Sequence, residues 1–193
     1  MLLVLALLAG VGTATAAAQR VQVTLDPAET KINISVHDVH GGVHGTFKLK
    51  SGAISFDRSS GEATGEVIVD ATSGETGNGT RDKKMHKEVL ESWRFAEITF
   101  LPKRVIGFGA APGSSNVQVQ GVFHIHGTDH DLTMEVPVQV SGDRVTGTTT
   151  FTVPYQSWGM KNPSVLFLRV DGRAEVSITA VGRITPANAV SQN

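Results

Sequence analysis

The chain has 193 residues, of which 40% are hydrophobic and 18% charged, and its formal net charge is −1 at pH 7. This length suits a single domain with a sizeable core. With 17 Lys and Arg residues, the chain lacks the overall basic charge of nucleic-acid-binding domains. The absence of cysteine excludes disulfide bonds, thiolate metal sites and thiol nucleophiles. The 21 glycines and the scarcity of Tyr and Trp favour short strands and tight turns over a helical bundle.

The N-terminal segment is typical of a secretory signal. Residues 2–11 form an apolar run that is shorter than the roughly 20 residues of a bilayer span, and small residues follow it up to Ala18. An apolar run closed by small residues indicates a signal peptide, although no Lys or Arg precedes this run. We therefore predict a signal peptide over residues 1–18, no stable membrane span, and a periplasmic or secreted protein.

From Val21 onward, apolar and polar residues alternate with a period of two, which is typical of half-buried antiparallel strands. Turn pairs such as Ser51-Gly52 and Asp171-Gly172 separate the segments. The alternating segments contain Val21, Val23, Leu25; Ile32, Ile34, Val36; Gly45, Phe47, Leu49; Ile54, Phe56; Gly65, Val67, Val69; Ile98, Phe100; Val117 to Ile125; Leu132 to Val140; Val145 to Val153; and Val176 to Ala180. We predict a single domain over residues 19–185 and a flexible tail over residues 186–193.

One segment departs from this period and predicts a short helix near residues 80–92. Met85 and Val89 lie four residues apart among good helix formers, Thr80 suits the N-cap, and Asp82 falls in the first turn. One short helix cannot cover the apolar faces of about ten strands, so the sheet has to fold against itself as a sandwich or close into a barrel.

Whether the interior is hollow stays open at the level of the residues. Gly45, Gly65, Gly121 and Gly147 are in the inward phase and leave room for a ligand. Alternatively, opposing phenylalanines fill this room and the protein is a packed sandwich.

An ordered set of short segments along the chain carries a family resemblance. The segments are His44-Gly45-Thr46-Phe47, Asp70-Ala71-Thr72-Ser73, Thr76-Gly77-Asn78, Arg81-Asp82, Ala96 to Phe100, Gln120 to Gly127, Phe151 to Tyr155, and Trp158-Gly159-Met160. Their order and spacing resemble the YceI-like family of exported lipid-binding proteins over about residues 21–184. The resemblance implies an all-β, extended lipocalin-like antiparallel barrel of eight or more strands with one helix. It also implies a polyisoprenoid or similar amphipathic lipid in the lumen, and no catalysis or cofactor.

Apolar side chains in the inward phase are the candidates for contact with a lipid tail. Such a tail binds by leaving water, which is worth about 0.8 kcal/mol for each buried CH₂ group. The candidates are Phe47, Phe56, Val67, Ile98, Phe100, Phe123, Met134 and Phe151, with Leu166 and Leu168 from a segment that is apolar on both faces. Taken singly, each of them is better explained as an ordinary core residue, and only the whole set, inside a barrel with small neighbours, favours a lumen.

An amphiphile also needs a site for its head group, and the basic residues around the predicted helix are the candidates. Arg81 and Lys84 suit a phosphate or carboxylate if the helix lies over one mouth of the barrel. His44 and His86 are further candidates near the same mouth. The alternative is a solvated helix face.

Histidines supply the competing hypothesis, a metal-binding module or metal-dependent enzyme. His124 and His126 share one strand face and could converge on a metal, and His130 follows four residues later. His124 and His126 alternate with Phe123 and Ile125, so we expect them to point away from the lumen and His130 to lie on the opposite face. The three imidazoles then do not converge, and we predict no metal site here.

A two-residue turn at Thr128-Asp129, pairing Gly127 with His130, would preserve these phases. The chain has no Gly-x-Ser-x-Gly, His-Glu-x-x-His or phosphate-binding loop motif, so we predict no enzymatic activity. The sequence leaves the oligomeric state open, including a homodimer.

Overall fold

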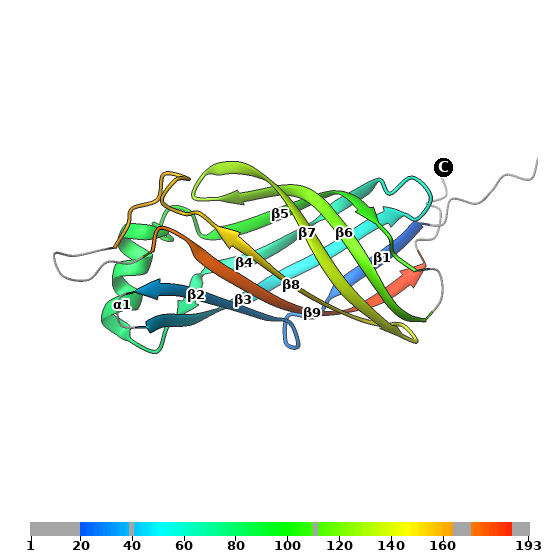
Figure 1. Cartoon of the computed structure of the whole chain (residues 1–193), viewed down its shortest axis with the longest axis horizontal. Coiled ribbons are helices and arrows are strands. Elements are labelled where there is room, and N and C mark those ends of the chain that lie inside the picture. Colours follow the sequence, from blue (N-terminus) through cyan, green and yellow to red (C-terminus); the bar gives the residue numbers. More distant parts are fainter. Residues whose placement is uncertain (1–19, 39–40, 110–111, 164–170, 187–193) are drawn as a thin grey trace, which may run out of the picture.

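The computed structural model describes residues 20–38, 41–109, 112–163 and 171–186 and contains nine strands and one short helix (Figure 1). The strands are β1 (Arg20–Leu25), β2 (Lys31–Asp38), β3 (Gly41–Asp57), β4 (Ala63–Glu75), β5 (Glu97–Ile106), β6 (Gly113–Ile125), β7 (Thr128–Ser141), β8 (Arg144–Val153) and β9 (Ala174–Pro186). The helix follows β4 and consists of α1 (Gly79–Lys84) and a π-helical turn, η1 (Met85–Val89). Within the described ranges, no helix has the length and apolar character needed to span a membrane.

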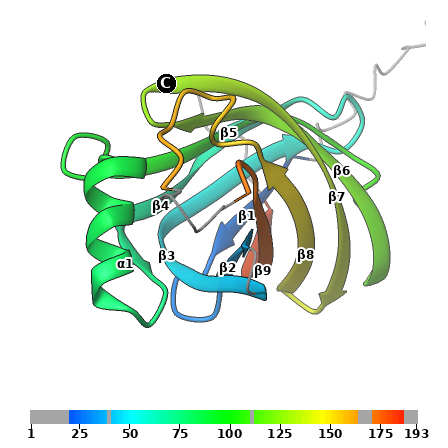
Figure 2. The ribbon, with the colours of Figure 1, turned by 60° about the vertical axis from the view of Figure 1, so that its left-hand side comes forward.

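The strands close into an antiparallel barrel with eight positions. Strands pair in the order β3-β2-β9-β8-β7-β6-β5-β4, and β4 pairs again with β3. β1 and β2 share one position, because β2 pairs with residues 41–47 of β3 whereas β1 pairs with residues 53–57 of the same strand. Figure 2 shows the curved wall with the helix at one end of the barrel. The fold is therefore the predicted barrel and not a sandwich.

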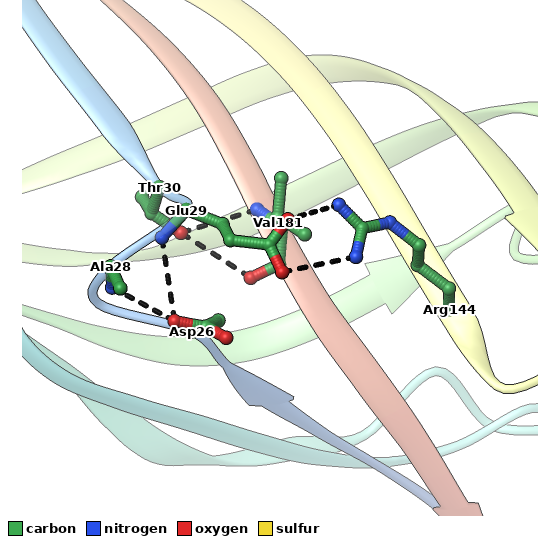
Figure 3. A network of polar contacts seen from close by, with 6 residues as sticks. All are labelled: Asp26, Ala28, Glu29, Thr30, Arg144 and Val181. Atoms are coloured by element: carbon green, nitrogen blue, oxygen red, sulfur yellow. Dashed lines mark hydrogen bonds and ion pairs between the residues drawn. The ribbon is translucent and has the colours of Figure 1, made fainter.

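A polar network holds the turn between β1 and β2, the two strands that share one position of the barrel (Figure 3). The Asp26 carboxylate accepts hydrogen bonds from the amides of Ala28 and Glu29 at 2.8 and 3.3 Å. The Thr30 hydroxyl donates to the Val181 carbonyl of β9 at 3.3 Å and accepts from the Val181 amide at 3.2 Å. Glu29 forms an ion pair with Arg144 of β8. The turn is thus fixed to the wall that it faces.

β3 is one long strand, and the turn expected at Ser51-Gly52 does not form. β3 continues through these residues, and its register with β4 shifts between Leu49 and Ser51. Such an irregularity bends a strand without ending it, and glycine often marks it. The described chain therefore has nine strands where the pattern of turns indicated about ten.

The helix lies where the sequence predicts it, but its ends differ. Asn78, not Thr80, is the N-cap, and its side-chain oxygen accepts from the amides of Thr80 and Arg81, both at 3.1 Å. Asp82 is in the first turn, as expected. The regular helix stops at Val89, because Glu91 adopts a positive φ of 45° that reverses the chain.

The turn between β6 and β7 is at His126-Gly127, so the prediction of a turn at Thr128-Asp129 is wrong. Ile125 pairs with Thr128, and both turn residues have positive φ, at 53° and 76°. A two-residue hairpin with positive φ at both positions favours glycine, which only Gly127 supplies in this stretch. The two-residue change of turn position leaves the predicted inward and outward faces of both strands unchanged.

Three predictions concern residues outside the described ranges. These are the signal peptide at residues 1–18, the tail beyond residue 186, and the apolar segment that contains Leu166 and Leu168. Pro186 itself belongs to β9 and pairs with Val21, so the barrel includes the first residue that we assigned to the tail.

Candidate functional site

The bore of the barrel contains two cavities in line. The larger one, the helix-end cavity, has a volume of about 550 Å³ and is lined partly by Met85 and Val89 of η1 and by β2. The smaller one, the far cavity, has a volume of about 190 Å³ and is lined partly by Val23 of β1 and by the opposite ends of β7 and β8. Two threonines, Thr99 and Thr149, are the only polar side chains among the 24 described residues that line the far cavity. The alternative of an interior filled by its own phenylalanines is therefore wrong for this barrel.

Five apolar residues border both cavities and mark the boundary between them. They are Val69, Ile98, Phe123, Phe151 and Ile178, from five different strands, and are called the ring below. The Phe123 and Phe151 rings meet edge to face, with their centroids 5.9 Å apart. Much of the wall of the far cavity belongs to a tightly packed core cluster, in which Val117 is only 2% exposed.

All eight described residues that we selected for contact with a lipid tail line these cavities. Phe47 borders the helix-end cavity, while Ile98, Phe123 and Phe151 belong to the ring. The remaining four line the far cavity: Phe56, Val67, Phe100 and Met134. The period-two pattern thus located the wall of the bore, and contact of these residues with a ligand stays a prediction.

Polar residues of the helix-end cavity gather at its mouth, beside the start of α1. Asn78, Thr80 and Arg81 line the cavity and are exposed, so the cavity opens to solvent there. Arg81 and Lys84 are its charged lining residues within the described ranges, which include no Asp or Glu in this lining. A cationic mouth thus leads into an apolar bore.

Neighbouring groups position both cations. The Arg81 guanidinium donates through Nε to the Thr76 hydroxyl at 2.7 Å and through Nη2 to the Thr76 carbonyl at 2.9 Å. Thr76 in turn donates its amide and hydroxyl hydrogens to Asp82 at 2.9 and 2.5 Å. The Lys84 ammonium donates to the Pro163 carbonyl at 2.8 Å. Neither cation is within ion-pair distance of a carboxylate in the described part of the chain.

The sequence profile of the YceI-like domain matches residues 23–182. The chain belongs to the YceI-like family. Solved structures agree on the fold. A polyisoprenoid binding domain from Saccharophagus degradans, implicated in plant cell wall breakdown, has a TM-score of 0.70 and 18% identity, covering 84% of this chain and 98% of that one. Burkholderia cenocepacia BcnA has a TM-score of 0.65 and 16% identity, with coverages of 81% and 98%. The Campylobacter jejuni YCEI protein has a TM-score of 0.58 and 17% identity, covering 73% of this chain and 84% of that one. No curated protein sequence matches significantly.

The two histidines proposed for the head group lie elsewhere in this YceI-like barrel. His44 is exposed on β3 and pairs with Ser35 of β2, and it does not line the helix-end cavity. His86 joins the helix to its neighbours: its Nε2 lies 2.8 Å from the Gly74 carbonyl and its Nδ1 lies 2.9 Å from the Ser92 hydroxyl. Because both ring nitrogens of His86 have protein partners, its place in the structure is that of a helix anchor.

The three histidines of the β6–β7 hairpin each contact a different partner. His124 contacts Asp129 at 2.6 Å on the outer face, and the ring of His126 packs against Phe95. His130 stacks on Trp158 with ring centroids 3.7 Å apart, and burial lowers its pKa. Within the described ranges, no three His, Asp or Glu side chains are grouped so that they could hold a metal ion.

Sequence reasoning missed two residues at the cavity. Thr76 fixes Arg81, and Tyr155 lines the helix-end cavity while its hydroxyl donates to the Asp171 carbonyl at 2.5 Å. Burial raises the pKa of Tyr155 to about 12. Both residues are within segments that carry the family resemblance, but no local pattern distinguishes them from turn residues.

Proposed function

We propose that this protein is an exported carrier that holds a polyisoprenoid or a similar long-chain amphiphile, with its tail in the bore and its head at the mouth. The observation that supports this proposal is a largely apolar bore that opens beside two cations. A cavity of about 550 Å³ is within the range of roughly 300–1,000 Å³ typical of ligand sites. The proposal is for binding, with sequestration or transport as its purpose, and not for catalysis.

The lining of the bore suits a flexible hydrocarbon. Each CH₂ group that leaves water for the bore contributes about 0.8 kcal/mol before the loss of ligand entropy. Met85 in the helix-end cavity and Met134 in the far cavity have unbranched side chains that adapt to irregular tails. Shape and apolarity therefore select for long chains over compact ligands.

The mouth suits an anionic or hydrogen-bond-accepting head group. Among the described residues, Arg81 has no acceptor for its Nη1 group, and Lys84 is an ammonium at the same cavity. Charge-assisted hydrogen bonds to phosphate or carboxylate are shorter and stronger than neutral ones. We assign the head group of the ligand to these two residues, and not to His44 or His86.

Export is the second part of the proposal. The apolar run and small residues before residue 19 support secretion. A carrier with a dry bore is useful in an aqueous compartment, where a free long-chain lipid is insoluble. The neighbouring structure from Saccharophagus degradans, described as a polyisoprenoid binding domain, supports the same ligand class.

Mass spectrometry of an organic extract tests the proposal. Gently purified protein should release a lipid with a long apolar chain, and delipidated protein should bind a prenyl phosphate saturably. The double variant Arg81→Gln/Lys84→Gln should weaken prenyl phosphate binding more than prenol binding. The matched control is Lys83→Gln/Lys87→Gln, which changes two exposed lysines of the same helix outside the cavity. Absence of both extracted lipid and saturable binding would reject the carrier function.

A further inference from the structure

The side chains of the ring that separates the two cavities are not fully packed on the side that faces the bore. Val69, Ile98, Phe123, Phe151 and Ile178 are each only half-buried, although their strands direct them into the bore. Val117, which also lines the far cavity, is by contrast only 2% exposed. The surface that the ring side chains still expose faces the cavities, so these side chains have space into which they can turn.

The part of the far cavity remote from the ring is walled by a buried core cluster. Phe56 and Val105 line the cavity and belong to this cluster together with Val21 and Ala63, and Phe108 packs edge to face on Phe56 with ring centroids 5.1 Å apart. A chain that comes from the mouth beside α1 reaches the far cavity by passing the ring, because the ring borders both cavities.

An empty far cavity is unfavourable. Its wall is almost entirely apolar, so it offers a water molecule few of the hydrogen bonds that an ordered water needs. The side chains around a void also lose dispersion contacts on that side. A hydrocarbon segment that enters restores these contacts. The far cavity adds roughly a third to the volume of the helix-end cavity.

We infer that the ring is a length gate for the ligand tail. A short tail ends before the ring and occupies the helix-end cavity alone. A longer tail displaces the Phe123 and Phe151 side chains, enters the far cavity and gains its apolar wall. The protein thereby prefers long tails, and the far cavity is the part of the site that measures length. This inference rests on the proposed function, because it specifies which members of the ligand class bind best.

A substitution that fills the far cavity tests the gate. Ala180 lines the far cavity from β9 and is not among the residues of the helix-end cavity. Ala180→Leu places extra side-chain volume in the space that a long tail would use. The matched control is Thr179→Leu, because the neighbouring residue on a strand points to the opposite face and Thr179 lines neither cavity.

The probes are farnesyl phosphate and octaprenyl phosphate, titrated into delipidated protein. The unchanged protein should bind the octaprenyl compound about ten-fold more tightly or better, and Ala180→Leu should reduce this preference to about three-fold or less without weakening farnesyl binding. Thr179→Leu should keep the full preference. Circular dichroism and thermal unfolding check that each variant folds, and Ala180→Val replaces Ala180→Leu if the latter does not.

Opening the ring tests its role as a barrier. Phe151→Ala should speed association of octaprenyl phosphate in stopped-flow experiments by a larger factor than it changes the association rate of farnesyl phosphate. If Ala180→Leu and Ala180→Val keep the full length preference, or if the unchanged protein binds both probes equally, the length gate is wrong and the carrier function stands. If the unchanged protein binds neither probe, both the carrier function and the gate are wrong.

Discussion

Tyr155 ties the loop after β8 to the segment that leads into β9. Its ring is 6% exposed, and its hydroxyl donates to the Asp171 carbonyl. Burial, assisted by the negative charge of Asp171, raises the pKa of the phenol from 10.0 to about 12. The folded protein therefore keeps a proton that the unfolded chain releases at lower pH.

The alkaline titration of Tyr155 is a direct prediction, since the chain contains one tyrosine. We expect tyrosinate absorbance to appear with a midpoint near pH 12. The free energy of unfolding should fall as pH rises from 10.0 to about 12, because only the unfolded chain is deprotonated in that window. Tyr155→Phe should remove the absorbance change. A midpoint near pH 10 in protein that is still folded would contradict the prediction.

Asp57 stabilises the turn between β3 and β4. Its carboxylate accepts from the Ser59 hydroxyl at 2.5 Å and from the amides of Ser60 and Ser59 at 2.9 and 2.8 Å. The Ser59 hydroxyl bond is the largest cause that lowers the pKa of Asp57 from 3.8 to about 2, followed by the two amide bonds. The charged carboxylate is thus part of the folded turn.

Acid unfolding should report this carboxylate. Since the folded pKa is lowered, the stabilisation by Asp57 is present above pH 3.8 and is lost as pH falls towards about 2. Ser59→Ala should raise the pKa of Asp57 and reduce this acid-dependent loss, and Asp57→Asn should abolish it. The measurement is urea unfolding at a series of acidic pH values. Equal pH dependence in the Asp57→Asn variant and the unchanged protein would refute the assignment.

At the scale of elements, β1 and β2 together fill the position between β3 and β9, and the turn that joins them is held to β9 by Thr30. Thr30 is 8% exposed and makes two hydrogen bonds with Val181, one as donor and one as acceptor. β9 pairs with β1 through residues 182–186 and with β2 through residues 175–179, and the Thr30 hydroxyl bonds to β9 between these two stretches. For the Val181 amide, the Thr30 side chain takes the place of a backbone acceptor.

We predict that Thr30→Val destabilises the protein by about 1–3 kcal/mol, because it removes the Thr30 oxygen that accepts from the buried Val181 amide, while the Val181 carbonyl keeps its bond from the Asp26 amide. Thr24→Val, at an exposed position of β1, should change stability by about 0.5 kcal/mol or less. Chemical denaturation of both variants measures the difference. Equal effects of the two substitutions would mean that the Thr30 hydroxyl does not stabilise the turn between β1 and β2.

The elements also show why strand boundaries are harder to predict than strand faces. The faces of β6 and β7 follow from alternation, which is local. The position of their turn depends on positive φ at His126, and the continuity of β3 through Gly52 depends on its pairing with β4. Gly52 faces Leu25 so closely that an added Cβ would lie 2.7 Å from its Cδ1 atom. These are contacts with other strands, so no local motif reports them.

At the scale of the whole molecule, the bore makes stability depend on its contents. A ligand that binds the folded state stabilises it by about 3–4 kcal/mol when its free concentration is roughly 100–1,000 times the Kd. We therefore predict that organic delipidation lowers the Tm and that prenyl phosphate restores it in a concentration-dependent way. The control ligand is inorganic phosphate, which has the charge without the tail. A Tm that is the same before and after delipidation, in protein shown to have lost lipid, would contradict this.

The sequence by itself determined the all-β class, the place of the helix, and the eight wall residues such as Phe47 and Phe151, because a strand directs alternate side chains to opposite faces wherever it pairs. It also selected Arg81 and Lys84. Only the tertiary structure decided that the interior is hollow, that Arg81 and Lys84 stand at its mouth while His44 and His86 do not, and that a ring divides the bore. The physical reason is that cavity volume depends on how side chains from different strands meet across the barrel, and strand pairing and register set that distance over the whole chain.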